Sequence, residues 1–101
     1  MAMPPEKKEE HSMRISDQFM LRQVADEYLV IPVGEAALRV KGLIGLSESG
    51  SLLYRRLQEG CAEEELIQAL LAEYDIDAET ARTDTRSFLD QMRRMGILIE
   101  D

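Results

Sequence analysis

The sequence lacks the residues on which common catalytic and metal sites depend. It has one cysteine, Cys61, and one histidine, His11, among 101 residues. A single cysteine cannot form an internal disulfide, and no second histidine or cysteine stands at metal-ligand spacing. A Ser-His or Cys-His nucleophile cannot be assembled either, because the one histidine lies in an N-terminal segment without an apolar period. We therefore expect no enzyme activity, no catalytic residues, no cofactor and no metal site.

Long apolar runs and positive charge are also scarce. No apolar run approaches 18 residues and no signal peptide precedes the domain, which indicates a cytoplasmic protein that does not enter a membrane. The 20 acidic and 12 basic residues give a net charge of -8, which opposes binding to nucleic acid, because a phosphate backbone requires clustered Lys and Arg. A chain of 101 residues supports one domain with little room for an active-site cleft, so a binding module is favoured.

The N-terminal segment differs in composition from the two strands that follow it. Met1 to Met13 contains a Lys7-Lys8-Glu9-Glu10 charge run and no apolar period, so we expect a disordered tail there and a domain over residues 14–101. Phe19 to Val33 then predicts two strands around a turn at Ala25-Asp26-Glu27. The second strand is apolar at successive positions. One of its faces should meet the helices, and the other a partner or a second copy.

A third strand follows a connecting segment that begins and ends with glycine. Gly34 to Gly42 forms this connection, with a short extended piece expected around Ala37 to Val40. Leu43 to Leu46 is then a short apolar run that leads straight into a helix, which predicts a strand. Together with the first two strands it would form a three-stranded antiparallel sheet.

Three helical periods occupy the rest of the chain. Their limits are set by good N-cap residues, Ser47 and Asp77, and by stopping glycines, Gly60 and Gly96. The second helix starts with three glutamates that complement the helix dipole, but Ala62 offers it no side-chain cap. The pattern predicts an α+β, winged-helix-like fold: an N-terminal three-stranded antiparallel β-sheet packed on three α-helices, ending in a short apolar wing at residues 97–99.

The third helix, expected from Ala78 to about Met95, carries the feature that most favours binding. At about 100° per residue, its core face consists of Ala81, Phe88, Met92 and Met95. Arg82, Arg86 and Arg93 share a neighbouring strip, with Leu89 at the seam. This predicts a groove with an apolar floor and a guanidinium rim, suited to an amphipathic peptide that bears carboxylates. The alternative is that these arginines pair with the acidic second helix and tail.

Three segments also carry a family resemblance. GLIGLSESGSLLYRRL at residues 42–57, EEELIQALLAEYDID at 63–77 and FLDQMRRMGIL at 88–98 resemble the coenzyme PQQ synthesis protein D (PqqD) family. The fold of that family is the peptide-binding module called the RiPP recognition element. The likeness spans roughly residues 19–98, although relatives commonly place a Thr cap where this chain has Ala62.

The resemblance implies a function as a peptide chaperone. The leader of a ribosomally made precursor peptide would add as a strand beside Leu43, Ile44, Gly45 and Leu46 and would lie against the third helix. The chain would then present the peptide to a radical SAM maturase, as in PQQ-type cofactor or peptide natural-product biosynthesis. The iron–sulfur clusters would belong to that partner, because this chain has one cysteine.

Two other classes stay open at the level of sequence. The second and third helices would suit a winged helix-turn-helix transcription regulator, with Arg82 and Arg86 near the start of a recognition helix. A dimerisation module is suggested by the two-sided apolar second strand, and a homodimer could exist alongside peptide binding.

Overall fold

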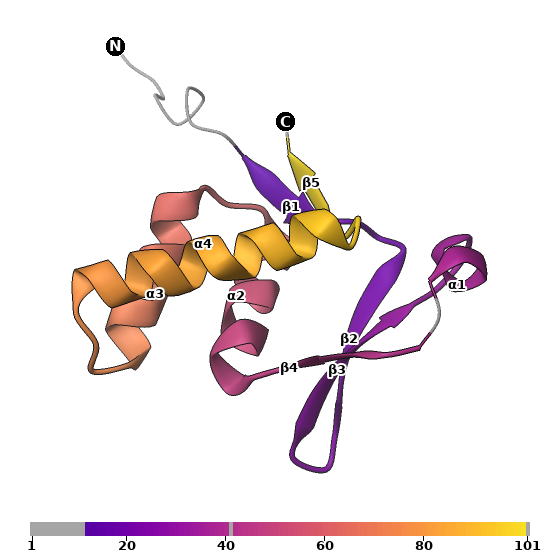
Figure 1. The fold of residues 1–101 in the computed structure, drawn as a ribbon, viewed down its shortest axis with the longest axis horizontal. Coiled ribbons are helices and arrows are strands. Elements are labelled where there is room, and N and C mark those ends of the chain that lie inside the picture. Colours follow the sequence, from indigo (N-terminus) through magenta and orange to yellow (C-terminus); the bar gives the residue numbers. More distant parts are fainter. Residues whose placement is uncertain (1–11, 41, 101) are drawn as a thin grey trace.

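The computed structural model describes residues 12–40 and 42–100 and has an α+β architecture (Figure 1). Helices α2, α3 and α4 gather at one end of the molecule, and the hairpin of β2 and β3 projects from the other. The elements in chain order are β1 (Met13–Ile15), β2 (Phe19–Val24), β3 (Glu27–Pro32), α1 (Ala36–Arg39), β4 (Ile44–Leu46), α2 (Glu48–Glu59), α3 (Glu63–Glu73), α4 (Ala78–Arg94) and β5 (Leu98–Glu100).

The three-stranded antiparallel sheet is confirmed, with β3 between β2 and β4. A two-residue turn joins β2 to β3, because Val24 pairs with Glu27. Its first residue, Ala25, has a φ of 58°. This left-handed conformation is unfavourable for alanine, and Asn, Asp or Gly would be the usual residue at this position of a two-residue hairpin turn.

The first and last strands of the chain, β1 and β5, form a second sheet that the sequence did not indicate. Met13 pairs with Glu100, and its backbone N–H also donates to the carbonyl of Cys61 at 2.8 Å. The expected tail boundary is wrong at Met13, whose side chain is buried in the core. Its partners are distant in sequence, so no local pattern marks it. Residues 1–11 of the expected tail lie outside the described residues.

The expected apolar wing after the last helix is the strand β5. It pairs with β1 rather than with the three-stranded sheet. The expected extended piece around Ala37 to Val40 is wrong, because the structure has the short helix α1 there. The N–H of Val40 donates to the carbonyl of Ala36 at 2.8 Å, and the fully buried side chain of Ala36 anchors this turn in the core.

The helix limits follow the capping residues that the sequence indicates. Ser47 Oγ accepts from the N–H of Gly50 at 3.0 Å, and the Asp77 carboxylate accepts from the N–H of Thr80 at 2.8 Å. The latter bond lowers the pKa of Asp77. Gly60, with a φ of 87°, ends α2. These predictions are confirmed, since a cap needs only neighbours along the chain.

The start of α3 forms one half of a capping box although Ala62 offers no side-chain acceptor. The backbone N–H of Ala62 donates to the carboxylate of Glu65 at 3.0 Å. This is the half of a capping box that a glutamate at the third helical position can make without a Ser or Thr. The first turn of α3 therefore keeps one of its end groups satisfied.

The core lies between the three helices and the inner face of the sheet. Its largest fully buried apolar side chains are Tyr54, Leu53, Leu57, Leu66, Leu70, Met92, Ile97 and Val30. On α4, Phe88 is buried as expected, but Met95 is 39% exposed and Thr85 is buried in the face assigned to it. The error arises because the helix ends at Arg94, so Met95 no longer follows the helical period.

Candidate functional site

Strand β4 lies at an edge of the three-stranded sheet. It pairs with β3 on one side, and the described residues place no strand on its other side. Leu43, expected as the first strand residue, precedes β4 and is 57% exposed. Ile44 and Leu46 are partly buried and pack against the core. An edge strand of this kind offers unpaired backbone groups to an extended chain.

The register identifies which backbone groups of β4 face the open edge. The N–H of Val33 donates to the carbonyl of Gln18, the residue before β2, at 2.8 Å. Val33 therefore directs its backbone groups toward β2. Backbone groups alternate in direction along a strand, so Tyr28 and Val30 direct theirs toward β4. Their partners are Leu46 and Ile44. These two residues therefore use their N–H and C=O groups within the sheet.

Gly45 is the β4 residue whose backbone N–H and C=O point away from β3. It lies between the two inward-bonded residues and opposite Leu29. A Cβ built at Gly45 would meet no atom within 4 Å. The glycine therefore presents both a free donor and acceptor and an unobstructed surface, which suits close approach of another backbone.

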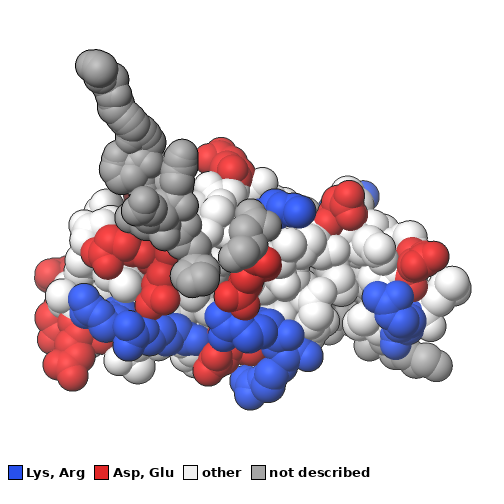
Figure 2. All heavy atoms as spheres, turned by 90° about the horizontal axis from the view of Figure 1, so that it is seen from above, with Lys and Arg blue, Asp and Glu red and all other residues white. Residues whose placement is uncertain are grey.

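The α4 arginines expected to form the groove rim are partly engaged in ion pairs. Arg86 Nε lies 2.8 Å from a Glu63 carboxylate oxygen of α3. Arg93 lies 2.9 Å from Asp90 and 2.7 Å from Glu100, and the Glu100 hydrogen bond raises the pKa of Arg93. Figure 2 shows Lys and Arg side chains in a band bordered by acidic ones. The alternative of pairing with the acidic second helix therefore holds for Arg86, whereas Arg93 pairs with Asp90 of its own helix and with Glu100 of β5.

These ion pairs do not remove the arginines from use by a ligand. The side chains of Arg86 and Arg93 are 65% and 48% exposed. Solvent-exposed pairs are worth about 0–1 kcal/mol, so an incoming carboxylate can compete for them. Arg82 is half-buried and makes no ion pair with any residue that the structure describes.

The assignment of Leu89 as an apolar groove floor is corrected by the structure. Its side chain is 3% exposed and belongs to the buried core cluster. The helical wheel placed it at the seam between the core face and the arginine strip. Packing of α4 against the rest of the fold turns that seam inward, so Leu89 supports the helix and is not available to a ligand.

An open hollow adjoins β4 where that strand leaves the sheet and becomes α2. We call it the hairpin hollow. It is lined by Gln23, Asp26, Glu27, Tyr28, Leu29, Gly45, Leu46, Ser47 and Glu48. Sequence patterns do not indicate its acidic members, because these come from a turn, a strand end and a helix start. No periodic pattern links these three places.

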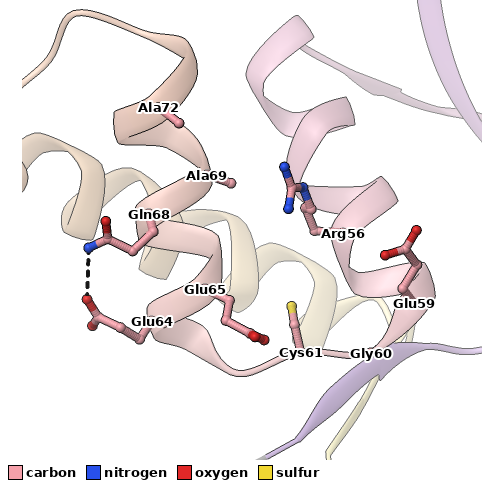
Figure 3. A pocket seen from close by; sticks show the side chains of 9 residues that line it. All are labelled: Arg56, Glu59, Gly60, Cys61, Glu64, Glu65, Gln68, Ala69 and Ala72. Atoms are coloured by element: carbon pink, nitrogen blue, oxygen red, sulfur yellow. Dashed lines mark hydrogen bonds between the residues drawn. The ribbon is translucent and has the colours of Figure 1, made fainter.

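A second hollow lies between α2 and α3 and contains the single cysteine (Figure 3). Arg56 and Glu59 approach it from α2, and Glu64, Glu65 and Gln68 from α3, with Gln68 Nε2 donating to Glu64 at 3.2 Å. Burial, together with the nearby Glu65 carboxylate, raises the pKa of the Cys61 thiol to about 11. A thiol with this pKa is protonated at neutral pH and is a weak nucleophile.

Cys61 should therefore react slowly with a thiol reagent in the folded protein. At pH 7.5 we expect modification by iodoacetamide to be at least roughly tenfold slower in buffer than in urea, because the folded thiol carries the higher pKa. Raising the pH toward 11 should narrow the difference. The folded protein should also lose stability as the pH rises from about 9, the ordinary thiol pKa, to about 11, because the folded state disfavours the thiolate. Equal rates at pH 7.5 would show that the thiol is not desolvated.

The described residues also bear on metal and membrane binding. Residues 12–40 and 42–100 hold no group of three or more metal-ligating side chains. No helix within those ranges is long and apolar enough to cross a bilayer.

The chain is similar to known proteins over most of its length. A family model described as coenzyme PQQ synthesis protein D (PqqD) matches residues 34–98. TbiB1 in complex with the TbiA(beta) leader peptide is 29% identical, with a TM-score of 0.69, over 84% of this chain and 93% of that one. Lasso peptide synthetase B1, complexed with the leader peptide, is 16% identical, with a TM-score of 0.69, over 86% and 96%. No curated protein matches the sequence.

Proposed function

The chain belongs to the PqqD family, and from that premise we propose that it binds the leader segment of a ribosomally made precursor peptide. The leader adds as a strand to the open edge of β4. One observation carries the proposal: the register leaves the N–H and C=O of Gly45 unpaired at that edge. The similarity to TbiB1, whose structure contains a leader peptide, also supports leader binding by this chain.

Side chains outside the strand give the peptide its direction and selectivity. Leu43, Ile44, Gly45 and Leu46 supply the edge, and backbone pairing along them is insensitive to peptide sequence. Arg82, Arg86 and Arg93 lie on the exposed side of α4 and attract carboxylates of the leader. Leu89 contributes by fixing the helix from beneath. Affinity then comes mainly from the backbone, and discrimination from the helix.

The chain acts as a carrier without catalysis of its own. It hands the bound peptide to a modifying enzyme, which by family resemblance is a radical SAM maturase in the cytoplasm. Neither nucleic acid nor membrane is a partner, in keeping with the net charge of -8. A second copy of the chain is a further proposed partner, because Met20 and Val24 expose apolar side chains on the outer face of the sheet.

An NMR titration tests the proposal directly. The probe is a synthetic leader from the short peptide gene expected beside this one. We expect the largest amide shifts at residues 43–47, with smaller shifts on the exposed side of α4. Shifts confined to α3, with β4 silent, would contradict the β-addition model. Tight, salt-sensitive binding to mixed genomic DNA fragments would instead favour the transcription regulator.

Charge reversal on α4 should weaken binding of an acidic leader. Arg82→Glu is the cleanest change, because Arg82 makes no ion pair with a described residue. We expect a roughly threefold to tenfold loss of affinity at low salt, shrinking as salt is added. Arg14→Glu, the same change on the exposed face of β1, serves as the control. Equal losses in the two variants, measured by calorimetry, would assign the effect to net charge alone.

A further inference from the structure

Gly45 is a strand residue whose identity the chain itself does not explain. Its φ is not positive, so the backbone of β4 does not require a glycine there. A Cβ at Gly45 would meet no described atom within 4 Å, so packing within the described chain does not require a glycine either. Glycine weakens a strand interior, and it often marks a place where another chain or a ligand approaches closely. The space beside Gly45 is therefore free for a group from outside the chain.

This space lies on the outer face of the sheet, which is turned away from the core. Ile44 and Leu46 pack against the core, and side chains alternate along a strand, so Gly45 belongs to the opposite face. Its partner on β3, Leu29, shares that outer face. A peptide residue paired with Gly45 places its side chain there too, because directly opposed residues point to the same side of a sheet.

Apolar side chains border the space on two sides. Leu29 lies across Gly45 from the peptide strand; it is half-buried and is not among the residues that pack against the core. Leu43 lies two residues before Gly45 on the same face and is 57% exposed. A peptide side chain that covers these two leucines would remove apolar surface from water.

The width of the sheet at Gly45 favours a long and flat apolar side chain. Neighbouring strands are about 4.8 Å apart, so the peptide and β3 are separated by about twice that distance. A side chain as short as alanine or serine stays over its own strand. An aromatic ring crosses Gly45 to meet Leu29, and it also reaches a diagonal neighbour, here Leu43. Pairing of an aromatic residue with an edge glycine is itself a stabilising arrangement in sheets.

Charge on the outer face does not favour a charged peptide residue of either sign. Arg22 lies opposite Leu29 on β2, and Glu27 lies two residues before Leu29 on the same face. Both are exposed, and neither makes an ion pair with a residue that the structure describes. One charge of each sign leaves little net potential beside Leu29. Apolar contact therefore decides which residue pairs with Gly45.

We propose that the peptide residue paired with Gly45 is aromatic, and that its ring lies over Gly45 against Leu29 and Leu43. The inference rests on the proposed function, since it requires a peptide strand at β4. It gives Gly45 two roles. Its N–H and C=O pair with the peptide backbone, and its missing side chain selects one residue of the peptide.

Selection from a phage-displayed library of random 12-residue peptides tests the inference. The full-length wild-type chain should enrich extended peptides with Phe, Tyr or Trp at one fixed position. Gly45→Val fills the space over the strand and should change this preference to small residues, while binding continues through the backbone. In NMR spectra of the wild-type chain with a selected peptide, the ring should shift the Gly45 Hα resonances upfield and give nuclear Overhauser effects to the Leu29 methyl groups.

Synthetic variants of a selected peptide measure the contact. Replacing the aromatic residue by Ala should lower affinity for the wild-type chain roughly fivefold. In Leu29→Ala the same replacement should cost only about twofold, because part of the contact is already lost. Leu71→Ala is the matched control, since Leu71 is also half-buried but lies on α3, outside the sheet. It should keep the full loss.

The outcomes separate this inference from the function beneath it. Selected peptides that shift the Gly45 amide but have no aromatic position, or whose ring does not contact Gly45, would overturn the inference and leave the β4 site intact. An unchanged aromatic preference in Gly45→Val would also overturn it. So would a peptide-free chain that dimerises over Gly45, because a second copy would then fill the space. Selected peptides that leave β4 unperturbed would overturn the proposed function, and the inference with it.

Discussion

Replacing Phe88 by alanine is expected to lower the free energy of unfolding by about 3 kcal/mol. Phe88 lies on α4, is 7% exposed and packs in the buried core cluster. Removing its ring leaves a cavity that the neighbouring side chains fill only in part. Domains of this size are stable by about 5–15 kcal/mol, so the loss should appear as a large shift in a urea or thermal unfolding curve.

Met95→Ala is the matched control for this prediction. The sequence pattern placed both residues on one helix face, but Met95 lies past the end of α4 and is 39% exposed. We expect its replacement to change the free energy of unfolding by less than about 0.5 kcal/mol. A larger loss for Met95→Ala than for Phe88→Ala would show that α4 is rotated from the orientation described.

Gly45→Pro is expected to weaken leader binding by tenfold or more while the domain stays folded. Proline removes the N–H that faces the open edge, and losing one backbone partner costs about 1–3 kcal/mol. Its ring also occupies space that the peptide needs. The fold should tolerate the change, because an edge position whose N–H faces solvent is where proline is accepted in a sheet. Calorimetry with the leader and a melting curve measure the two effects separately.

Ile44→Pro and Gly45→Ala are the controls that make this test sharp. The N–H of Ile44 faces β3, so proline there should destabilise the sheet itself and not only binding. Alanine at Gly45 keeps the N–H and meets no atom within 4 Å, so its effect on affinity should be much smaller than that of proline. If Gly45→Pro binds the leader like the wild type, the peptide does not use this edge.

The helices and their limits could be predicted because their signals are local. Ser47 and Asp77 cap helices through bonds to residues three positions away, and Gly60 ends α2 by its own conformation. Apolar spacing gave the three helices and the three strands of the main sheet. The short strand at residues 44–46 was found for the same reason, since a brief apolar run before a cap is visible in the chain.

Contacts between distant residues could not be predicted. Met13 is in the fold because it pairs with Glu100 and bonds to Cys61, and nothing next to Met13 in sequence carries that information. The partner of Arg86 is Glu63, which is 23 residues away on α3. Charge pattern allowed either this pair or a free guanidinium. Only the packing of α3 against α4 selects between them.

The amino-acid sequence was sufficient for the α+β class, the helix caps, the family and the strand proposed to receive a peptide, because each rests on residues close together in the chain. The tertiary structure was needed for the direction of the backbone groups of Gly45, the burial of Leu89 and the meeting of Asp26, Glu27 and Glu48 in one hollow. Strand register and helix rotation fix these features. Both are set by which side chains fill the common core, and a one-residue slip of β4 would turn the backbone groups of Gly45 toward β3.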